Sequence, residues 1–152
     1  MQMFQGTLIQ MTHHDFDGID VAWMAVDVLG QVAIFTTGGV GPVPSTAVAS
    51  IDITESEVDW LPETSGVDLL VNLPRTDDFV GFAKRGFFAY DWSDVHRATR
   101  HRIDGYELQA RPLRPLTLTD LPASMQIAAV AAKLPKVSFG SSVIPAAALV
   151  KA

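Results

Sequence analysis

The residues best suited to metal chemistry stand together near the start of the chain. They are His13, His14, Asp15 and Asp17. Carboxylates at alternate positions resemble part of a calcium loop, and histidine side chains could bind zinc or iron. The calcium pattern also needs a bidentate acid at a fixed distance further along, which the chain does not supply in register. An exposed acidic turn is therefore the preferred interpretation, and a small metal-dependent or small-molecule-binding enzyme with a His/Asp site at residues 13–20 is the alternative.

No stretch of the chain carries a specific catalytic signature. Cysteine is absent, and so is the Gly-x-Ser-x-Gly elbow of many hydrolases. The glycine cluster Gly38–Gly41 invites a phosphate-loop interpretation, but Pro42 and Pro44 remove two backbone donors and no lysine is near. The sequence therefore favours a protein without enzymatic activity, and it predicts no catalytic residues and no cofactor.

The charges are divided unequally along the chain. Residues 1–74 contain ten acids and no lysine or arginine, whereas all 11 basic residues follow from Arg75 onward beside the other seven acids. One explanation is that the two halves pack together and neutralise each other. The other is an acidic face for a basic protein partner, with an aromatic anchor. The predicted partner-binding residues are Asp15, Asp17, Asp20, Glu55, Glu57, Asp59, Trp60 and Glu63.

A basic cluster in the second half offers a different kind of surface. It comprises His96, Arg97, Arg100, His101 and Arg102. Arginine side chains match phosphate geometry, but the sequence pI of about 5.0 differs from the values above about 9 that are typical of nucleic-acid-binding domains. We expect a solvated loop that pairs with the acidic half, and no nucleic-acid partner.

Length and composition indicate one folded domain. The chain has 152 residues, of which 48% are hydrophobic and 18% charged, so it is poorer in charge than a typical soluble domain. No apolar run reaches the roughly 18 residues that span a bilayer, and the N-terminus does not resemble a secretory signal. We therefore expect a cytoplasmic protein with no membrane partner. Self-association into a homodimer through apolar surface is a further alternative.

The stretch from Ile19 to Pro44 organises the predicted fold. Two apolar runs, Val21–Val28 and Gln31–Thr37, flank the pair Leu29-Gly30 and end at glycines and prolines, which is typical of a β-hairpin. Both faces of the first run are apolar, so it is expected to lie inside a sheet or to be covered on both sides.

The remaining elements predict an α+β domain, mainly an antiparallel sheet built on this central hairpin, with a few short helices packed on it. Further strands are expected at 87–92 and 105–118, the latter broken by prolines and therefore at a sheet edge. Helices are expected at 45–50, at 55–61 with Thr54 as N-cap, at 79–83 after the capping side chains of residues 76–78, and from about 121 to 132.

Three segments carry a resemblance to a known kind of protein. WMAVDVLGQVAIFTTGGVGPVP, GFFAYDWSDVHRA and GYELQARPLRPL together resemble small bacterial proteins of immunity-protein type, which neutralise a cognate toxin. The resemblance implies a stoichiometric binder whose function lies in its surface. It assigns no role to individual residues.

Overall fold

A hairpin of two buried strands lies inside the main sheet. The computed structural model describes residues 12–13, 16, 18–71, 76–92 and 104–149. Strand β2 (Ala22–Asp27) pairs antiparallel with β3 (Val32–Thr36), and every residue of β2 is buried. The predicted hairpin is thus confirmed, and so is the covering of its first arm on both sides.

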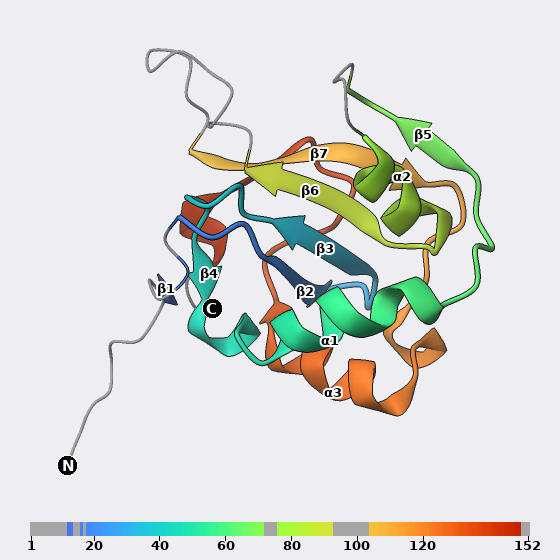
Figure 1. Ribbon diagram of the computed structural model, residues 1–152, viewed down its shortest axis with the longest axis horizontal. Coiled ribbons are helices and arrows are strands. Elements are labelled where there is room, and N and C mark those ends of the chain that lie inside the picture. The colour runs from blue at the N-terminus through green and yellow to red at the C-terminus, as the bar shows by residue number, and fades with distance from the viewer. Residues whose placement is uncertain (1–11, 14–15, 17, 72–75, 93–103, 150–152) are drawn as a thin grey trace.

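The main sheet is mixed rather than purely antiparallel. In the part of the chain that the structure describes, its order is β5-β7-β6-β3-β2-β8, and β9 also pairs with β7 (Figure 1). The β3–β6 and β2–β8 pairings are parallel, and the others are antiparallel. A second, two-stranded sheet joins β1 and β4. The strand bounds are Thr12–His13 (β1), Val43–Pro44 (β4), Val67–Leu69 (β5), Phe88–Trp92 (β6), Gly105–Pro112 (β7), Lys133–Leu134 (β8) and Val143–Pro145 (β9).

Helices and the C-terminal segment cover opposite faces of the hairpin. Because side chains alternate along a strand, Met24 and Ile34 pack with Met125 of one layer, whereas Trp23 and Phe35 pack against the opposite layer. The α-helices are α1 (Ser50–Glu57), α2 (Asp77–Lys84) and α3 (Ala123–Ala131). Short 3-10 turns are η2 (Ser45–Ala47), η3 (Val58–Trp60), η6 (Leu118–Asp120) and η7 (Ala146–Leu149). The chain therefore has the predicted α+β fold.

Two local predictions are wrong. The sequence between Ser45 and Leu61 does not form two helices separated by a cap at Thr54. Instead α1 runs through Thr54, and the β-branched residues around it are accommodated because Ile51 and Thr54 are buried against the rest of the fold. Likewise β7 is not an edge strand: it pairs with β6 on one side and with β5 and β9 on the other. Its Pro112 stands at the last position of the strand, where a missing donor disturbs the ladder least.

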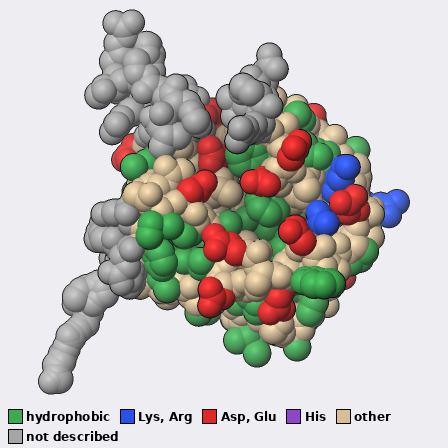
Figure 2. All heavy atoms as spheres, in the orientation of Figure 1, with side chains coloured by type: hydrophobic (Ala, Val, Ile, Leu, Met, Phe, Trp, Pro, Cys, Tyr) green, Lys and Arg blue, Asp and Glu red, His purple; other side chains and the backbone are tan. Residues whose placement is uncertain are grey.

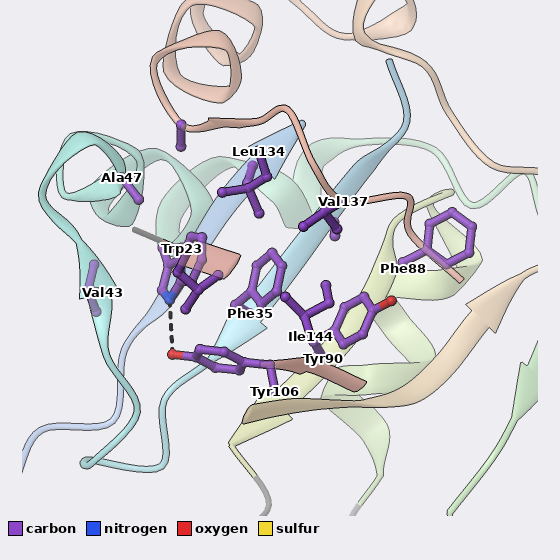
Figure 3. Packing of buried hydrophobic residues seen from close by; sticks show 14 of the residues in the cluster. Trp23, Phe35, Val43, Ala47, Phe88, Tyr90, Tyr106, Leu134, Val137 and Ile144 are labelled. Atoms are coloured by element: carbon purple, nitrogen blue, oxygen red, sulfur yellow. Dashed lines mark hydrogen bonds between the residues drawn. The ribbon is translucent and has the colours of Figure 1, made fainter. Parts of the chain in front are cut away.

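Aromatic side chains fill the layer on the side of the C-terminal segment (Figure 3). The Trp23 and Phe35 rings are stacked with centroids 4.1 Å apart, and Tyr106 meets both edge-on. The Trp23 indole N–H donates to the Tyr106 hydroxyl at 3.2 Å, and that hydroxyl donates to the Pro42 carbonyl at 2.9 Å. The polar atoms of this layer thus have partners, as burial requires.

Burial of the two tyrosines makes the fold sensitive to strongly alkaline pH. Loss of water around the phenol raises the pKa of Tyr90 from 10.0 to about 12, and it also raises the pKa of Tyr106. Since the folded state holds these protons more tightly, their contribution to stability is complete below pH 10 and is lost as pH rises toward 12. We expect the free energy of unfolding, measured by urea denaturation, to fall over this interval, and to fall less steeply in Tyr90→Phe. A tyrosinate absorbance that titrates near pH 10 in the folded protein would contradict this expectation.

Candidate functional site

An acidic cleft opens between α1 and α2 beside the start of β2. Its volume is about 260 Å³. Figure 2 shows acidic side chains around a hollow with a hydrophobic floor on the face that carries these two helices. The lining residues are Asp20, Val21, Ala22, Thr36, Thr54, Glu55, Asp59, Asp78 and Phe82.

Local structure explains how four carboxylates reach one cleft. Glu55 and Asp59 are four residues apart along α1 and η3, so they lie on the same side of this helical segment. Asp20 directly precedes the buried part of the hairpin, and Asp78 stands in the first turn of α2. The acids therefore come from three separate elements and surround the same space.

Backbone amides hold two of these carboxylates in place. Asp20 Oδ1 accepts a hydrogen bond from the Gly38 N–H at 2.9 Å, and Glu55 Oε2 accepts one from the Ala22 N–H at 3.0 Å. The second bond ties α1 to the first residue of β2. Such bonds orient the acids without neutralising their charge.

Cations are missing from the lining of the cleft. The lining includes no lysine, arginine or histidine. Among the residues that the structure describes, none of the four carboxylates forms an ion pair. The cleft thus concentrates four formal negative charges of exposed side chains beside an apolar floor, and their summed potential attracts cations.

Thr54 also lines the cleft, but its hydroxyl is inaccessible from it. Its side chain is only 4% exposed, and its hydroxyl oxygen is buried without a hydrogen-bond partner. A threonine inside a helix commonly satisfies its hydroxyl on the carbonyl four residues earlier, but here that bond is not formed. A buried hydroxyl without a partner costs about 1–3 kcal/mol of stability.

The acids of the cleft do not form a metal centre. Within the described ranges, no group of three or more histidine, cysteine, aspartate or glutamate side chains could hold a metal ion. Ionised carboxylates are purely hydrogen-bond acceptors, so these side chains offer acceptors to a ligand.

The structure brings together only part of the predicted acidic surface. Asp20, Glu55 and Asp59 line the cleft, whereas Glu57 and Trp60 do not. Asp15 and Asp17 lie outside the described residues. So do His14, the side chain of His13 and the basic cluster at 96–102, and the alternative metal site at His13, His14, Asp15 and Asp17 therefore stays a prediction.

Glu63 is already engaged by an arginine from the second half of the chain. Arg85 Nη2 lies 3.4 Å from Glu63 Oε2. The same guanidinium donates to the carbonyl oxygens of Leu61, Gly81 and Asp59 at 3.1, 2.9 and 3.3 Å. Arg85 thus links η3 to α2 through hydrogen bonds. It contacts only the backbone of Asp59, so the Asp59 carboxylate remains part of the cleft lining. For this pair, the prediction that basic residues of the second half neutralise acids of the first half is confirmed.

Asp78 lines the cleft but was not among the predicted partner-binding residues. Asp77 and Asp78 were predicted only as capping side chains before a short helix, and they lie in the first turn of α2. Because α2 packs opposite α1, Asp78 also lines the cleft. No spacing in the sequence predicts that these two helices lie opposite each other. The amphipathic pattern of α2 was the available signal, since Asp78 and Phe82 are four residues apart and both line the cleft.

Comparison of the chain with protein-family models, curated proteins and solved structures finds no match. Among the described residues, no helix is long and apolar enough to cross a membrane. The function is therefore inferred from the chemistry of the acidic cleft.

Proposed function

We propose that this protein is a non-enzymatic binding protein that holds a basic protein partner on the face around the acidic cleft. The observation that carries the proposal is the gathering of four carboxylates, without a lining cation, at an exposed hollow. An immunity protein that neutralises a basic toxin or effector in the cytoplasm is the specific form of this function that we favour. The acidic balance of the first half, ten acids with no lysine or arginine in residues 1–74, supports the same kind of partner.

Electrostatics explains what such a face would contribute. Complementary charge increases the rate at which two proteins meet, commonly by 10- to 1,000-fold at low salt. Carboxylates that stay unpaired in the free protein retain this attraction for an incoming cation. The advantage should shrink as salt is added, because the Debye length is only about 8 Å at physiological ionic strength.

Trp60 is a suitable anchor next to the cleft. It follows Asp59 directly, and 84% of its surface is exposed. Its indole N–H donates to the Ser56 carbonyl at 3.2 Å, which steadies the ring against the end of α1. Tryptophan is enriched among residues that dominate binding energy at interfaces. A steadied, exposed ring loses little conformational entropy on binding.

Charge reversal in the cleft tests the proposal. The immobilised protein is incubated with the proteins of its native host, and a captured basic protein is purified for kinetic measurement by surface plasmon resonance. We expect Asp59→Lys or Asp78→Lys to lower the association rate about tenfold at low salt. The matched control is Asp68→Lys on β5, which changes the net charge equally outside the lining.

Two results would refute the proposal. One is that no protein is captured by the wild type. The other is that Asp59→Lys and Asp68→Lys change the association rate by the same amount, which would show that net charge and not the cleft attracts the partner.

A further inference from the structure

We propose that two copies of this chain pair weakly through the outer face of α3, as a symmetric, antiparallel helix pair centred on Ile127. Helix α3 contributes no residue to the lining of the acidic cleft, so this inference does not depend on the proposed function. The exposure of α3, its lack of charge and the symmetry of its outer face each favour this pairing.

The composition of α3 is that of a buried helix, yet one side of it faces solvent. Its nine residues, ASMQIAAVA, include no charged side chain. A helix that is apolar on every side is normally covered on every side. Here Met125, Ala128 and Ala129 are buried, whereas Ile127 is 75% exposed and Val130 is 49% exposed. In Figure 1 α3 lies at the lower border of the molecule, and Figure 2 shows hydrophobic side chains along the same border. This outer face is thus left for another molecule to cover.

Charge favours a second copy as the molecule that covers α3. From Leu121 to Ala152 the chain contains three lysines and no aspartate or glutamate. Helices α1 and α2, by contrast, each expose acids. Each copy carries a net charge of -6, so of the described α-helices α3 is the one where two copies meet with least repulsion. A basic partner would gain no charge attraction from α3 itself.

The two ends of α3 are flanked by opposite charges. Asp120 is exposed shortly before the helix begins, and Lys133 is exposed shortly after it ends. In an antiparallel pair, the end of one helix lies beside the start of the other. Lys133 of one copy then approaches Asp120 of the other copy at both ends of the interface, and these charges are complementary. A parallel pair would instead bring like charges together.

The outer face of α3 is symmetric about Ile127. Ser124 and Val130 lie three residues away from it in either direction, Ala123 and Ala131 lie four residues away, and all five are exposed. Residues three and four apart share one face of a helix. A twofold dimer needs a patch that is complementary to itself. The small side chains around Ile127 leave room for Ile127 of the other copy to pack between them.

The size of this face predicts a weak dimer. A helix of nine residues is about 13.5 Å long at a rise of about 1.5 Å per residue. Stable interfaces bury about 800 Å² on each partner, which is more than one helix of this length supplies. We therefore expect a dissociation constant on the order of 100 μM, so that the protein is monomeric when dilute and dimeric when concentrated.

Sedimentation equilibrium of the full chain tests the pairing. The wild type should change from monomer to dimer between about 10 μM and about 1 mM. Ile127→Lys places two like charges against each other at the centre of the interface and should weaken association by about tenfold or more. The matched control Leu113→Lys makes the same charge change outside α3, at a residue that is 66% exposed, and should leave association unchanged. Because both positions are exposed, neither variant should lower the melting temperature appreciably.

A single introduced thiol locates the centre of the interface. The chain has no cysteine, so Ile127→Cys carries the sole thiol of each copy. A disulfide forms only where two thiols can approach closely. With oxidised glutathione as the oxidant, Ile127→Cys should therefore form a covalent dimer about tenfold faster than Leu113→Cys, because the two thiols meet at the centre of the helix pair.

The outcomes distinguish a second copy from other occupants of α3. A wild type that stays monomeric at about 1 mM refutes the pairing, and so does a variant Ile127→Lys that dimerises as the wild type does. If Lys133→Glu weakens association no more than Lys136→Glu does, the antiparallel arrangement is refuted. If the wild type is monomeric but Ile127→Lys no longer binds a captured basic protein, that protein and not a second copy covers α3, and the inference is overturned.

Discussion

Replacing Trp23 with alanine is expected to destabilise the protein by about 3–5 kcal/mol. The side chain is fully buried, stacks on Phe35 at 4.1 Å and donates to the Tyr106 hydroxyl. Truncation would leave a cavity and would deprive that hydroxyl of its donor. Because domains are stable by only about 5–15 kcal/mol, the midpoint of urea denaturation should fall sharply.

Trp60→Ala is the matched control, since it removes the same side chain from an exposed position. With 84% of its surface exposed, Trp60 should contribute no more than about 0.5 kcal/mol to folding. The same variant should bind the captured partner more weakly, because the ring is proposed as an anchor. Equal destabilisation by Trp23→Ala and Trp60→Ala would show that the described core does not determine stability.

Asp27→Ala is expected to cost about 3 kcal/mol or more, although the residue takes no part in the cleft. Its carboxylate is fully buried and accepts four hydrogen bonds. Oδ1 accepts from the Leu29 and Gln31 N–H groups at 2.9 and 2.8 Å, and Oδ2 accepts from Gln31 Nε2 at 3.0 Å and from the Phe139 N–H at 2.7 Å. Alanine would leave these donors without their acceptor in a buried place.

Asn tests whether both carboxylate oxygens are needed. Asp27→Asn keeps the shape but turns one acceptor into an NH₂ donor, which would face another N–H group. We therefore expect a substantial loss of stability in urea denaturation with Asn as well, and a small one with the exposed control Asp68→Ala. A variant Asp27→Asn as stable as the wild type would contradict the role assigned to Oδ2.

Asp27 also illustrates a difference between two kinds of acid in this chain. The carboxylate of Asp27 is surrounded by donors and joins the hairpin turn to the C-terminal segment, so its role is structural. Neither Asp59 nor Asp78 has a side-chain hydrogen bond among the described residues, although both line an exposed cleft. Exposed acids without a partner in the folded chain are available for an interaction with another molecule.

Local patterns in the sequence determined the elements with strong periodicity. The hairpin, the strand at Phe88–Trp92 and the helices at Asp77–Lys84 and Ala123–Ala131 follow from apolar spacing and capping residues close together in the chain. The acidic character of the first half was equally visible, and it pointed to three of the four cleft acids. These features depend on neighbours within a few residues, which is why they can be inferred from sequence.

Only the tertiary structure decided which elements meet. The interior position of β7, the continuous helix through Thr54 and the parallel β3–β6 pairing depend on contacts between distant segments. The same holds for the cleft, because α2 brings Asp78 opposite acids that precede it by about twenty residues or more. Such contacts are set by the burial of shared apolar faces and leave no fixed spacing in the sequence. The acidic character of the first half could therefore be read from the sequence. The cleft could not, because it forms only when α1, α2 and the start of β2 pack together.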